Sequence, residues 1–255
     1  AKKQFGQHFL ADRYYVDKIV MAVNPVAGDN LVEIGPGQGA ITFPLLRKHP
    51  RLTVIEFDHD LIAPLAAAAA PLGELTIIHR DVLQVDFSAL AEPGRKIRLV
   101  GNLPYNISSP ILFHALEHAA AISDMTFMLQ KEVVDRMAAG PGSKVYGRLS
   151  VMLQAYCRVD SLFIVPPGAF RPPPKVDSAV ARLVPHDPAT IGINDPARFA
   201  EVVRAAFGQR RKTLRNALNG VCTAEQFAAA GVRPEARAEQ IEVAQFIALA
   251  NAAAA

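Results

Sequence analysis

The sequence predicts an α/β protein with a doubly wound parallel sheet and a smaller all-α C-terminal domain. Short apolar runs rich in β-branched residues alternate with segments of helical periodicity between residues 31 and 139, which is the pattern of such a sheet. Beyond residue 187 only helical patterns follow. Because Pro185 and Pro188 bracket a linker between the two patterns, we expect domains at 1–187 and 188–255.

The elements follow in order along the chain. Buried parallel strands are predicted from their short apolar runs at residues 31–34, 52–55, 75–78, 97–100 and 125–129. Helical spacing occurs at residues 40–48, 58–70, 108–117 and 131–139. A further strand is predicted at 178–184, after a loop in which each residue before a proline is kept out of the helical region. The C-terminal helices are expected at residues 196–207, 210–218, 223–230 and 238–255.

The composition excludes several classes of protein. With 51% hydrophobic residues and a formal net charge of +3, the chain does not have the composition of a disordered protein. The two cysteines, Cys157 and Cys222, cannot build a disulfide framework or a CxxC site. The sequence has no signal-peptide pattern at its start, and its most apolar stretch, residues 61–72, contains two prolines. We therefore expect a soluble, cytoplasmic protein that does not enter a membrane.

A glycine-rich turn lies between the first predicted strand and its helix. Gly35 and Gly37 let the backbone turn sharply and approach a ligand. Glu56 ends the next predicted strand, where a carboxylate can accept both hydroxyl hydrogens of a ribose. The glycine turn and Glu56 together predict a nucleoside-bearing cofactor. The spacing from Gly35 to Ala40 also fits the dinucleotide fingerprint, so a nicotinamide cofactor stays open, as does a tight turn with surface acids.

Two further acids favour a different nucleoside over a nicotinamide dinucleotide. Glu33 stands two residues before the first glycine, where it can meet the ammonium group of an amino-acid-like ligand. Asp81 follows the third predicted strand, where it can accept a hydrogen bond from an adenine amino group.

The sequence Asn102-Leu103-Pro104-Tyr105 follows the fourth predicted strand, at the sheet edge where such folds bind ligands. The exocyclic amine of adenine is a poor nucleophile because its lone pair is delocalised into the ring. Acceptors from the Asn102 side chain and the Leu103 main chain would localise that pair, while Pro104 stiffens the turn and Tyr105 offers a flat face. The tetrapeptide resembles the Asn/Asp-Pro-Pro-Tyr signature of amino-methyltransferases. The alternative is a turn that only caps the next helix.

Two groups of residues further along the chain indicate RNA. Phe170 lies between Pro166-Pro167 and Pro172-Pro173-Pro174 and is the expected stacking partner of Tyr105 on a flipped base, or else a core residue under a loop. Clustered basic side chains predict phosphate contacts, the alternative being a solvated helix face; they are Arg204, Arg210, Arg211, Lys212 and Arg215. Lys2 and Lys3 add to the same positive charge.

The histidines show no metal-ligand spacing apart from the pair His114 and His118, for which no third ligand pattern is found. We therefore expect no metal.

Taken together, these motifs resemble the KsgA/RsmA family of ribosomal small-subunit RNA adenine dimethyltransferases. The resemblance covers nearly the whole chain in order, at residues 5–10, 32–37, 102–108, 127–133, 146–151, 165–178 and 207–216. It implies a Rossmann-like methyltransferase domain at 1–187 and a helical RNA-binding domain at 188–255. It also implies transfer of methyl groups from S-adenosylmethionine, with S-adenosylhomocysteine as product.

The acceptors implied by the resemblance are the N6 atoms of two adjacent adenosines in the 3′-terminal hairpin of 16S ribosomal RNA, each receiving two methyls. The expected partner is an immature small-subunit particle, the expected role is in ribosome biogenesis, and the free protein is expected to be a monomer. The donor would contact His8, Leu10, Glu33, Gly35, Gly37, Glu56, Asp81, Val82 and Asn102. The family commonly has Asn in the place of His8.

The implied chemistry is an in-line displacement that depends on positioning and on stabilising the amine as it gains charge, with no general base. Three alternatives remain from the residues alone. They are a non-catalytic RNA-binding assembly factor, a large-subunit RNA adenine methyltransferase of the antibiotic-resistance type, and a nicotinamide dehydrogenase. The basic run at 210–216 favours small-subunit RNA over large-subunit RNA as the substrate.

Overall fold

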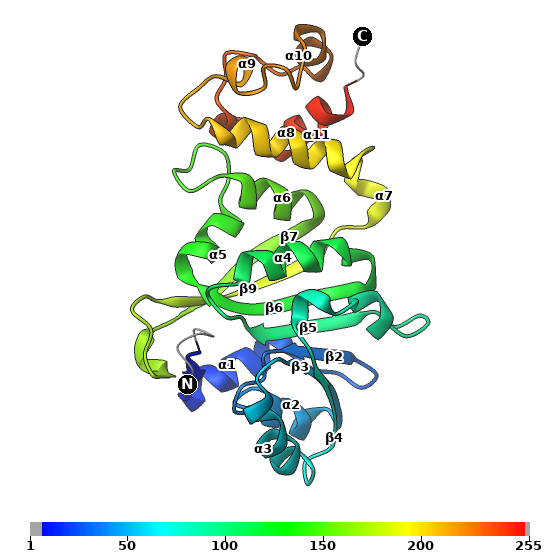
Figure 1. The fold of residues 1–255 in the computed structure, drawn as a ribbon, viewed down its shortest axis with the longest axis vertical. Helices are drawn as coiled ribbons and strands as arrows, with labels where there is room; N and C mark the ends of the chain where they lie inside the picture. The colour runs from blue at the N-terminus through cyan, green and yellow to red at the C-terminus, as the bar shows by residue number, and fades with distance from the viewer. Residues whose placement is uncertain (1–6, 253–255) are drawn as a thin grey trace. The chain divides into compact units, whose positions relative to one another are not determined.

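A seven-stranded sheet in the order β4-β3-β2-β5-β6-β9-β7 is the centre of the first of two units in the chain (Figure 1). The structure is a computed structural model and describes residues 7–252. The strands are β2 (Asn30–Ile34), β3 (Arg51–Glu56), β4 (Glu74–His79), β5 (Ile97–Asn102), β6 (Ile122–Gln130), β7 (Cys157–Val165) and β9 (Ser178–Pro185). A second, two-stranded sheet pairs β1 (Phe9–Leu10) with β8 (Phe170–Arg171).

The strand order contains the switch point of a doubly wound sheet. Strands β2 to β6 are parallel, and the chain runs outward from β2 to β4 before it returns to β5 on the other side of β2. In the register between β2 and β5, Ile34 faces Gly101. The turn after β2 and the end of β5 therefore meet at one edge, where open sheets of this kind bind ligands.

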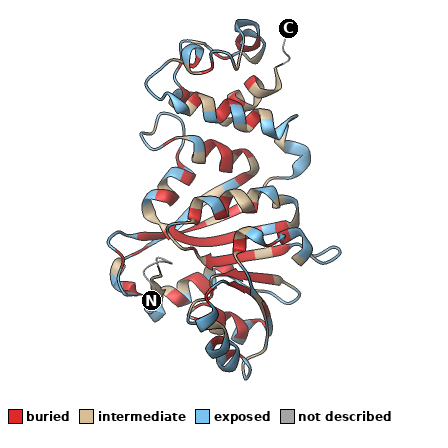
Figure 2. Cartoon of the chain, viewed as in Figure 1, coloured by how far each residue is buried: buried red, intermediate tan, exposed pale blue. Residues whose placement is uncertain are grey.

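The five predicted parallel strands are confirmed, and burial explains the lack of alternation in β2, β3, β5 and β6. The prediction of burial is wrong for β4, which has no buried residue because it lies at the edge of the sheet. Strands β5, β6 and β9 are buried over most of their length (Figure 2). Strand β9 runs antiparallel to β6. Strand β7, next to it at the sheet edge, has both buried and exposed residues without a regular period, which is why the sequence pattern does not reveal it.

Helices connect the strands of the first unit. They are α1 (Arg13–Val23), α2 (Thr42–Lys48), α3 (His59–Ala69) and α4 (Ser108–Glu117), with short turns η2 (Val82–Gln84), η3 (Phe87–Leu90), η4 (Ala119–Ala121) and η5 (Pro167–Ala169). Asp12 and Asp58 cap α1 and α3 through their side chains, as N-cap residues of this type do.

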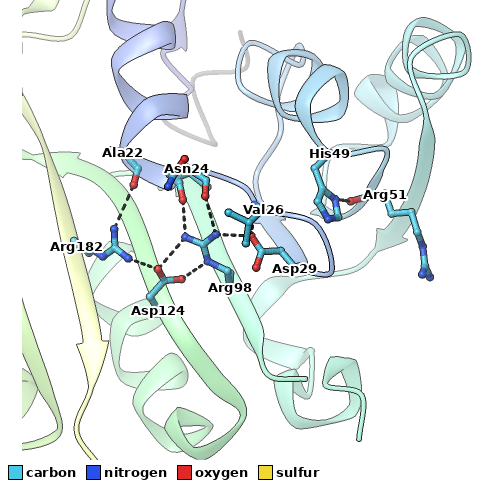
Figure 3. A network of polar contacts seen from close by, with 10 residues as sticks. Ala22, Asn24, Val26, Asp29, His49, Arg51, Arg98, Asp124 and Arg182 are labelled. Carbon is cyan, nitrogen blue, oxygen red and sulfur yellow. Dashed lines mark hydrogen bonds and ion pairs between the residues drawn. The ribbon is translucent and has the colours of Figure 1, made fainter. Parts of the chain in front are cut away.

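A polar network closes the amino end of the sheet (Figure 3). Arg98 on β5 forms ion pairs with Asp29 at 2.6 Å and with Asp124 at 2.9 Å. Its guanidinium also donates to the main-chain oxygen of Val23 at the end of α1, at 2.5 Å, where a cation is favourable. Arg182 on β9 reaches the same Asp124 at 2.7 Å. The charged side chains at this end of the sheet thus form ion pairs with one another.

The second unit comprises Asp135–Val159 and His186–Ala255. Its helices are α6 (Arg148–Tyr156), α7 (Pro188–Ile191), α8 (Pro196–Gly208), α9 (Leu214–Ala217), α10 (Ala224–Ala230) and α11 (Val243–Asn251), with the turn η6 (Ala238–Gln240). Helix α5 (Lys131–Ala138) begins in the first unit and ends in the second. The fully buried Tyr146 joins the early segment to the later one by donating to the main-chain oxygen of Ile241 at 2.9 Å.

Two expectations about the C-terminal part need revision. The segment 210–218 forms a helix only at Leu214–Ala217, because residues 209–212 make a turn in which the nitrogen of Lys212 donates to the oxygen of Gln209. Within its described part, 238–252, the long helix expected at 238–255 is a short turn followed by Val243–Asn251. Residues 253–255 lie outside the described residues. One unit boundary falls between Pro185 and His186. The functional division at 187 stays a prediction. None of the helices within residues 7–252 has the length and apolar character needed to cross a membrane.

Candidate active site

A cavity of about 260 Å³ opens at the carboxyl edge of the sheet, around the ends of β2, β3 and β5. It gathers segments far apart in the sequence. All the predicted donor-binding residues and the whole tetrapeptide line it: His8, Leu10, Glu33, Gly35, Gly37, Glu56, Asp81, Val82, Asn102, Leu103, Pro104 and Tyr105. Their roles stay predictions, but their convergence on one cavity gives those predictions a common site.

The glycine turn after β2 is fastened to the end of β3. Gly35 and Gly37 have φ angles of 65° and 56°, in the region that favours glycine. A Cβ atom on Gly37 would lie 3.1 Å from the ring of Phe9, so a side chain there would press against the N-terminal strand. The nitrogen of Gly37 donates to Glu56 Oε2 at 3.3 Å. The backbone therefore lines the cavity at a position where a side chain would be strained and would press on Phe9.

Glu56 is held rigidly at the cavity wall. The residue is only 7% exposed, and its Oε1 accepts a hydrogen bond from the nitrogen of Asp58 at 2.8 Å. Burial raises the pKa of Glu56, although the main-chain N–H donors oppose this by stabilising the carboxylate. An acid anchored in this way has a fixed direction toward a ligand.

Glu33 is more deeply buried. The residue is 1% exposed, and Thr42 Oγ1 donates to its Oε2 at 2.6 Å. Burial raises the pKa of Glu33 to about 8, with a smaller contribution from the charge of Glu56, while the bond from Thr42 lowers it. A carboxyl with this pKa is mainly protonated at neutral pH until a cation arrives.

Hydrogen bonds fix the tetrapeptide turn. Asn102 Nδ2 donates to the main-chain oxygen of His8 at 3.1 Å. The nitrogen of Leu103 donates to the main-chain oxygen of Met128 at 3.0 Å, which holds the turn on β6. The amide orientation of Asn102 is thereby set, and its Oδ1 is the end that remains an acceptor.

Tyr105 is positioned by two neighbours. Its hydroxyl lies 2.5 Å from Ser178 Oγ, and its ring stacks on that of His8 with 5.5 Å between centroids. Burial raises the pKa of Tyr105. His8 Nδ1 lies 2.9 Å from the oxygen of Pro172, and because a carbonyl only accepts, this nitrogen carries the proton.

Phe170 is a correction to the sequence analysis. Its ring is fully buried in the core cluster that also contains Leu10, the residue opposite it in the β1–β8 pair. It does not line the cavity. The proline-rich loop thus turns this ring inward beneath the site, and in this conformation Phe170 has no exposed face on which a base can stack.

Two of the five basic residues have partners within the second unit, and the predicted phosphate contacts of all five stay predictions. Arg210 donates to the main-chain oxygens of Lys144 at 2.6 Å and Tyr146 at 3.0 Å, and lies 3.5 Å from Glu239. Arg215 pairs with Glu235 at 2.7 Å. Their guanidinium groups already bind within the second unit. All five residues are exposed, Arg204, Arg211 and Lys212 among them. Lys2 and Lys3 lie outside the described residues.

Sequence reasoning missed some residues of the cavity wall. Phe57 directly follows Glu56, and Arg80 directly precedes Asp81. Phe57 is 58% exposed, so its ring offers a flat apolar face to a ligand. Adjacency to the two acids is the signal that points to both residues.

Comparison with known proteins identifies the family. Residues 1–255 match the family described as "Ribosomal RNA adenine dimethylase". Ribosomal RNA small subunit methyltransferase A of Xanthomonas axonopodis pv. citri (strain 306) is 79% identical over 98% of this chain and 95% of that protein. The protein of the same name from Xanthomonas campestris pv. campestris (strain B100) is 78% identical over the same shares.

Solved structures agree with this result. A dimethyladenosine transferase from Plasmodium falciparum is similar with a TM-score of 0.80 and 25% identity, over 95% of this chain and 96% of that one. The 23S rRNA methyltransferase ErmE shares the fold, with a TM-score of 0.71 and 24% identity over 95% and 98% of the two chains. The fold is thus the predicted Rossmann-like methyltransferase fold, and the chain belongs to the ribosomal RNA adenine dimethylase family.

Proposed function

We propose that this protein transfers methyl groups from S-adenosylmethionine to N6 of two adjacent adenosines in the 3′-terminal hairpin of 16S ribosomal RNA, two to each adenine. The observation that carries the proposal is one cavity lined by the glycine turn, Glu56 and the Asn102–Tyr105 turn. The names of the 79% identical relatives, which are small-subunit RNA methyltransferases, support the choice of RNA over the large-subunit alternative.

The residues present fit S-adenosylmethionine. A glycine turn in the cavity wall, with positive φ at Gly35 and Gly37, and a buried carboxyl at Glu33 suit a ligand that has both a close-packed nucleoside and an ammonium group. Glu56 accepts the ribose hydroxyls, Asp81 accepts from the adenine amine, and Glu33 meets the ammonium. When bound, the group supplies an electrophilic methyl at a sulfonium.

The protein's own part in the reaction is to hold the nucleophile. Asn102 Oδ1 and the main-chain oxygen of Leu103 accept hydrogens of the adenine N6 amine, which localises its lone pair and stabilises the positive charge that develops. Tyr105, held by Ser178, offers a face for the base. In-line placement of amine and methyl supplies much of the rate. No side chain needs to take a proton, since the methylated ammonium loses it to solvent.

The hydrogen bond of Asn102 explains why His8 is tolerated where the family commonly has Asn. The acceptor is the main-chain oxygen of His8, which any residue supplies. The imidazole adds a stacking contact with Tyr105. The side chain at this position therefore contributes a contact with Tyr105 but is not needed for the hydrogen bond from Asn102.

We place the acceptor RNA in an immature small-subunit particle in the cytoplasm, with the protein a monomer and residues 188–255 docking on RNA. Arg204, Arg211 and Lys212 are exposed and contact phosphates in this proposal. Donor binding and transfer belong to residues 1–187.

The test is mass analysis of RNA after incubation with isotopically labelled S-adenosylmethionine, using small-subunit particles, naked 16S RNA and large-subunit RNA. We expect two adjacent dimethylated adenosines in the particle RNA. Transfer to large-subunit RNA alone would establish the antibiotic-resistance type of activity instead. Donor binding without transfer to any of the three would favour an assembly factor.

A further inference from the structure

A cluster of metal-ligating side chains lies at the C-terminal end of α4, outside the cavity described above. His114, Glu117 and His118 each offer one ligand atom, and these atoms lie within 4.8 Å of one another. The sequence shows only the histidine pair at i and i+4. Glu117, at i+3 from His114, is the third residue on the same helix face. Among residues 7–252 this is the group of His, Cys, Asp and Glu side chains close enough to hold a metal ion.

The tautomer of His114 is set by the main chain. Its Nε2 lies 2.7 Å from the oxygen of Val85. Because a carbonyl oxygen only accepts, Nε2 carries the hydrogen, and Nδ1 of the neutral ring has the free lone pair. This Nδ1 lies 3.8 Å from Glu117 Oε2. Metal-binding histidines are typically oriented in this way, with the second ring nitrogen donating to a carbonyl or carboxylate.

His118 has a carboxylate behind its ring. Its Nδ1 lies 3.4 Å from Asp86 Oδ1 and 3.1 Å from Ser88 Oγ. Asp86 Oδ1 is itself fixed, because it also accepts from the nitrogen of Ser88 at 2.9 Å. With the hydrogen on Nδ1, Nε2 is the nitrogen left to bind a cation. A carboxylate in this place raises the basicity of a histidine ligand.

Packing holds the two rings in place. The buried Phe87 lies edge-on to both, with 4.9 Å between its centroid and that of His114 and 5.6 Å to that of His118. The two histidine centroids are 4.9 Å apart. The histidine side chains are 14% and 19% exposed, whereas Glu117 is 74% exposed. Two ligands are thus pre-oriented, and the third is free to close on an ion from solvent.

We propose that this cluster binds one divalent transition-metal ion of the Zn²⁺ class through His114 Nδ1, His118 Nε2 and the Glu117 carboxylate. Two imidazole nitrogens and one carboxylate suit Zn²⁺ and its neighbours and do not suit Mg²⁺ or Ca²⁺, which prefer oxygen. The bound ion links the end of α4 to the Asp86–Ser88 turn. Asp81 and Val82 of the cavity wall lie a few residues before this turn. Because the ion would hold the turn on α4, we expect it to stabilise the first unit.

The experiment is a titration of the full chain, kept reduced, with Zn²⁺ by calorimetry and with Co²⁺ by absorption. We expect one equivalent to bind, with cobalt d–d bands but no thiolate charge-transfer band, and a rise in the thermal midpoint that grows with metal concentration. His118→Ala should weaken binding at least about tenfold, and Asp86→Asn by about 10–100-fold through the outer contact.

The matched control is His59→Ala. His59 is an exposed histidine whose ring lies 5.5 Å from that of His79, a pair outside the metal-ligating group. This variant should bind metal as the unaltered protein does. Glu117→Ala, at an exposed position, provides a second loss-of-ligand variant if His118→Ala unfolds.

Three results would overturn the proposal. The first is no stoichiometric binding of either metal by the unaltered protein. The second is an equal loss of affinity in His59→Ala and in both ligand variants, or no loss in the ligand variants. The third is a thiolate charge-transfer band, which would place the ion on Cys157 or Cys222.

Discussion

Asn102 Nδ2 donates to the main-chain oxygen of His8 at 3.1 Å, across 94 positions of sequence. This bond ties the end of β5 to the N-terminal segment that precedes β1. It orients the amide oxygen that the proposed reaction uses. Because the acceptor is main chain, His8→Asn should retain most of the transfer activity, measured as initial rate on small-subunit particles. A collapse of the rate in His8→Asn would mean that the imidazole itself is required.

Glu56→Ala should weaken donor binding by roughly 1–3 kcal/mol, the range for loss of a charged hydrogen-bond partner. Calorimetry with S-adenosylmethionine measures this directly. Glu74→Ala is the control, since Glu74 is exposed and pairs with Arg51 on the strand next to it. Equal donor affinity in the Glu56 variant and the unaltered protein would remove Glu56 from the site.

The raised pKa of Glu33 predicts a pH dependence of stability. In the unfolded chain its pKa is near 4.5, and in the folded protein it is about 8. Between these values the folded state holds an extra proton, so this group makes stability fall as pH rises through the window. Glu33→Gln should remove that contribution. We therefore expect the thermal midpoints of the two proteins to be similar at about pH 5. At about pH 8, the midpoint of Glu33→Gln should be higher than that of the unaltered protein.

The same group predicts a proton release. If the donor ammonium meets Glu33, binding favours the carboxylate, and a proton leaves at neutral pH. Calorimetry in buffers of different ionisation enthalpy should detect it, and Glu33→Gln should abolish it. Release that persists unchanged in Glu33→Gln would assign the proton to another group.

The second unit offers a test that separates RNA docking from stability. Replacing the exposed Arg211 and Lys212 by Ala should flatten the dependence of log K on log salt for structured RNA by about 1–2 units. The thermal midpoint and donor affinity should not change. Arg210→Ala should instead lower the thermal midpoint, because Arg210 binds the main chain of Lys144 and Tyr146. An unchanged salt slope in the double variant would move RNA docking elsewhere, such as the rim around Tyr105.

The sequence predicts the site well where the signal is local. The glycine turn, Glu56 and the Asn102–Tyr105 turn each follow a strand, and parallel strands bring their carboxyl ends to one edge. The prediction that Phe170 stacks on a base is wrong, because the pairing of β8 with β1 buries its ring. This pairing joins distant segments, and the spacing of the prolines does not encode it.

The same limit applies to the second unit and to the histidine pair. Residues 135–159 join the later helices through Tyr146 and Ile241, which no periodicity shows. The internal pairing of Arg210 and Arg215 likewise depends on the positions of distant acids and carbonyls. For His114, the deciding contact is with the oxygen of Val85, in a preceding turn.

The central claim is that Asn102 acts on the amine in the transition state, and single-turnover methyl transfer by Asn102→Ala tests it most directly. The rate of the chemical step on small-subunit particles should fall by about 10²–10³-fold, as for other lost transition-state hydrogen bonds, while donor affinity changes much less. A single-turnover rate equal to that of the unaltered protein, with the variant folded and the donor bound, would contradict the mechanism.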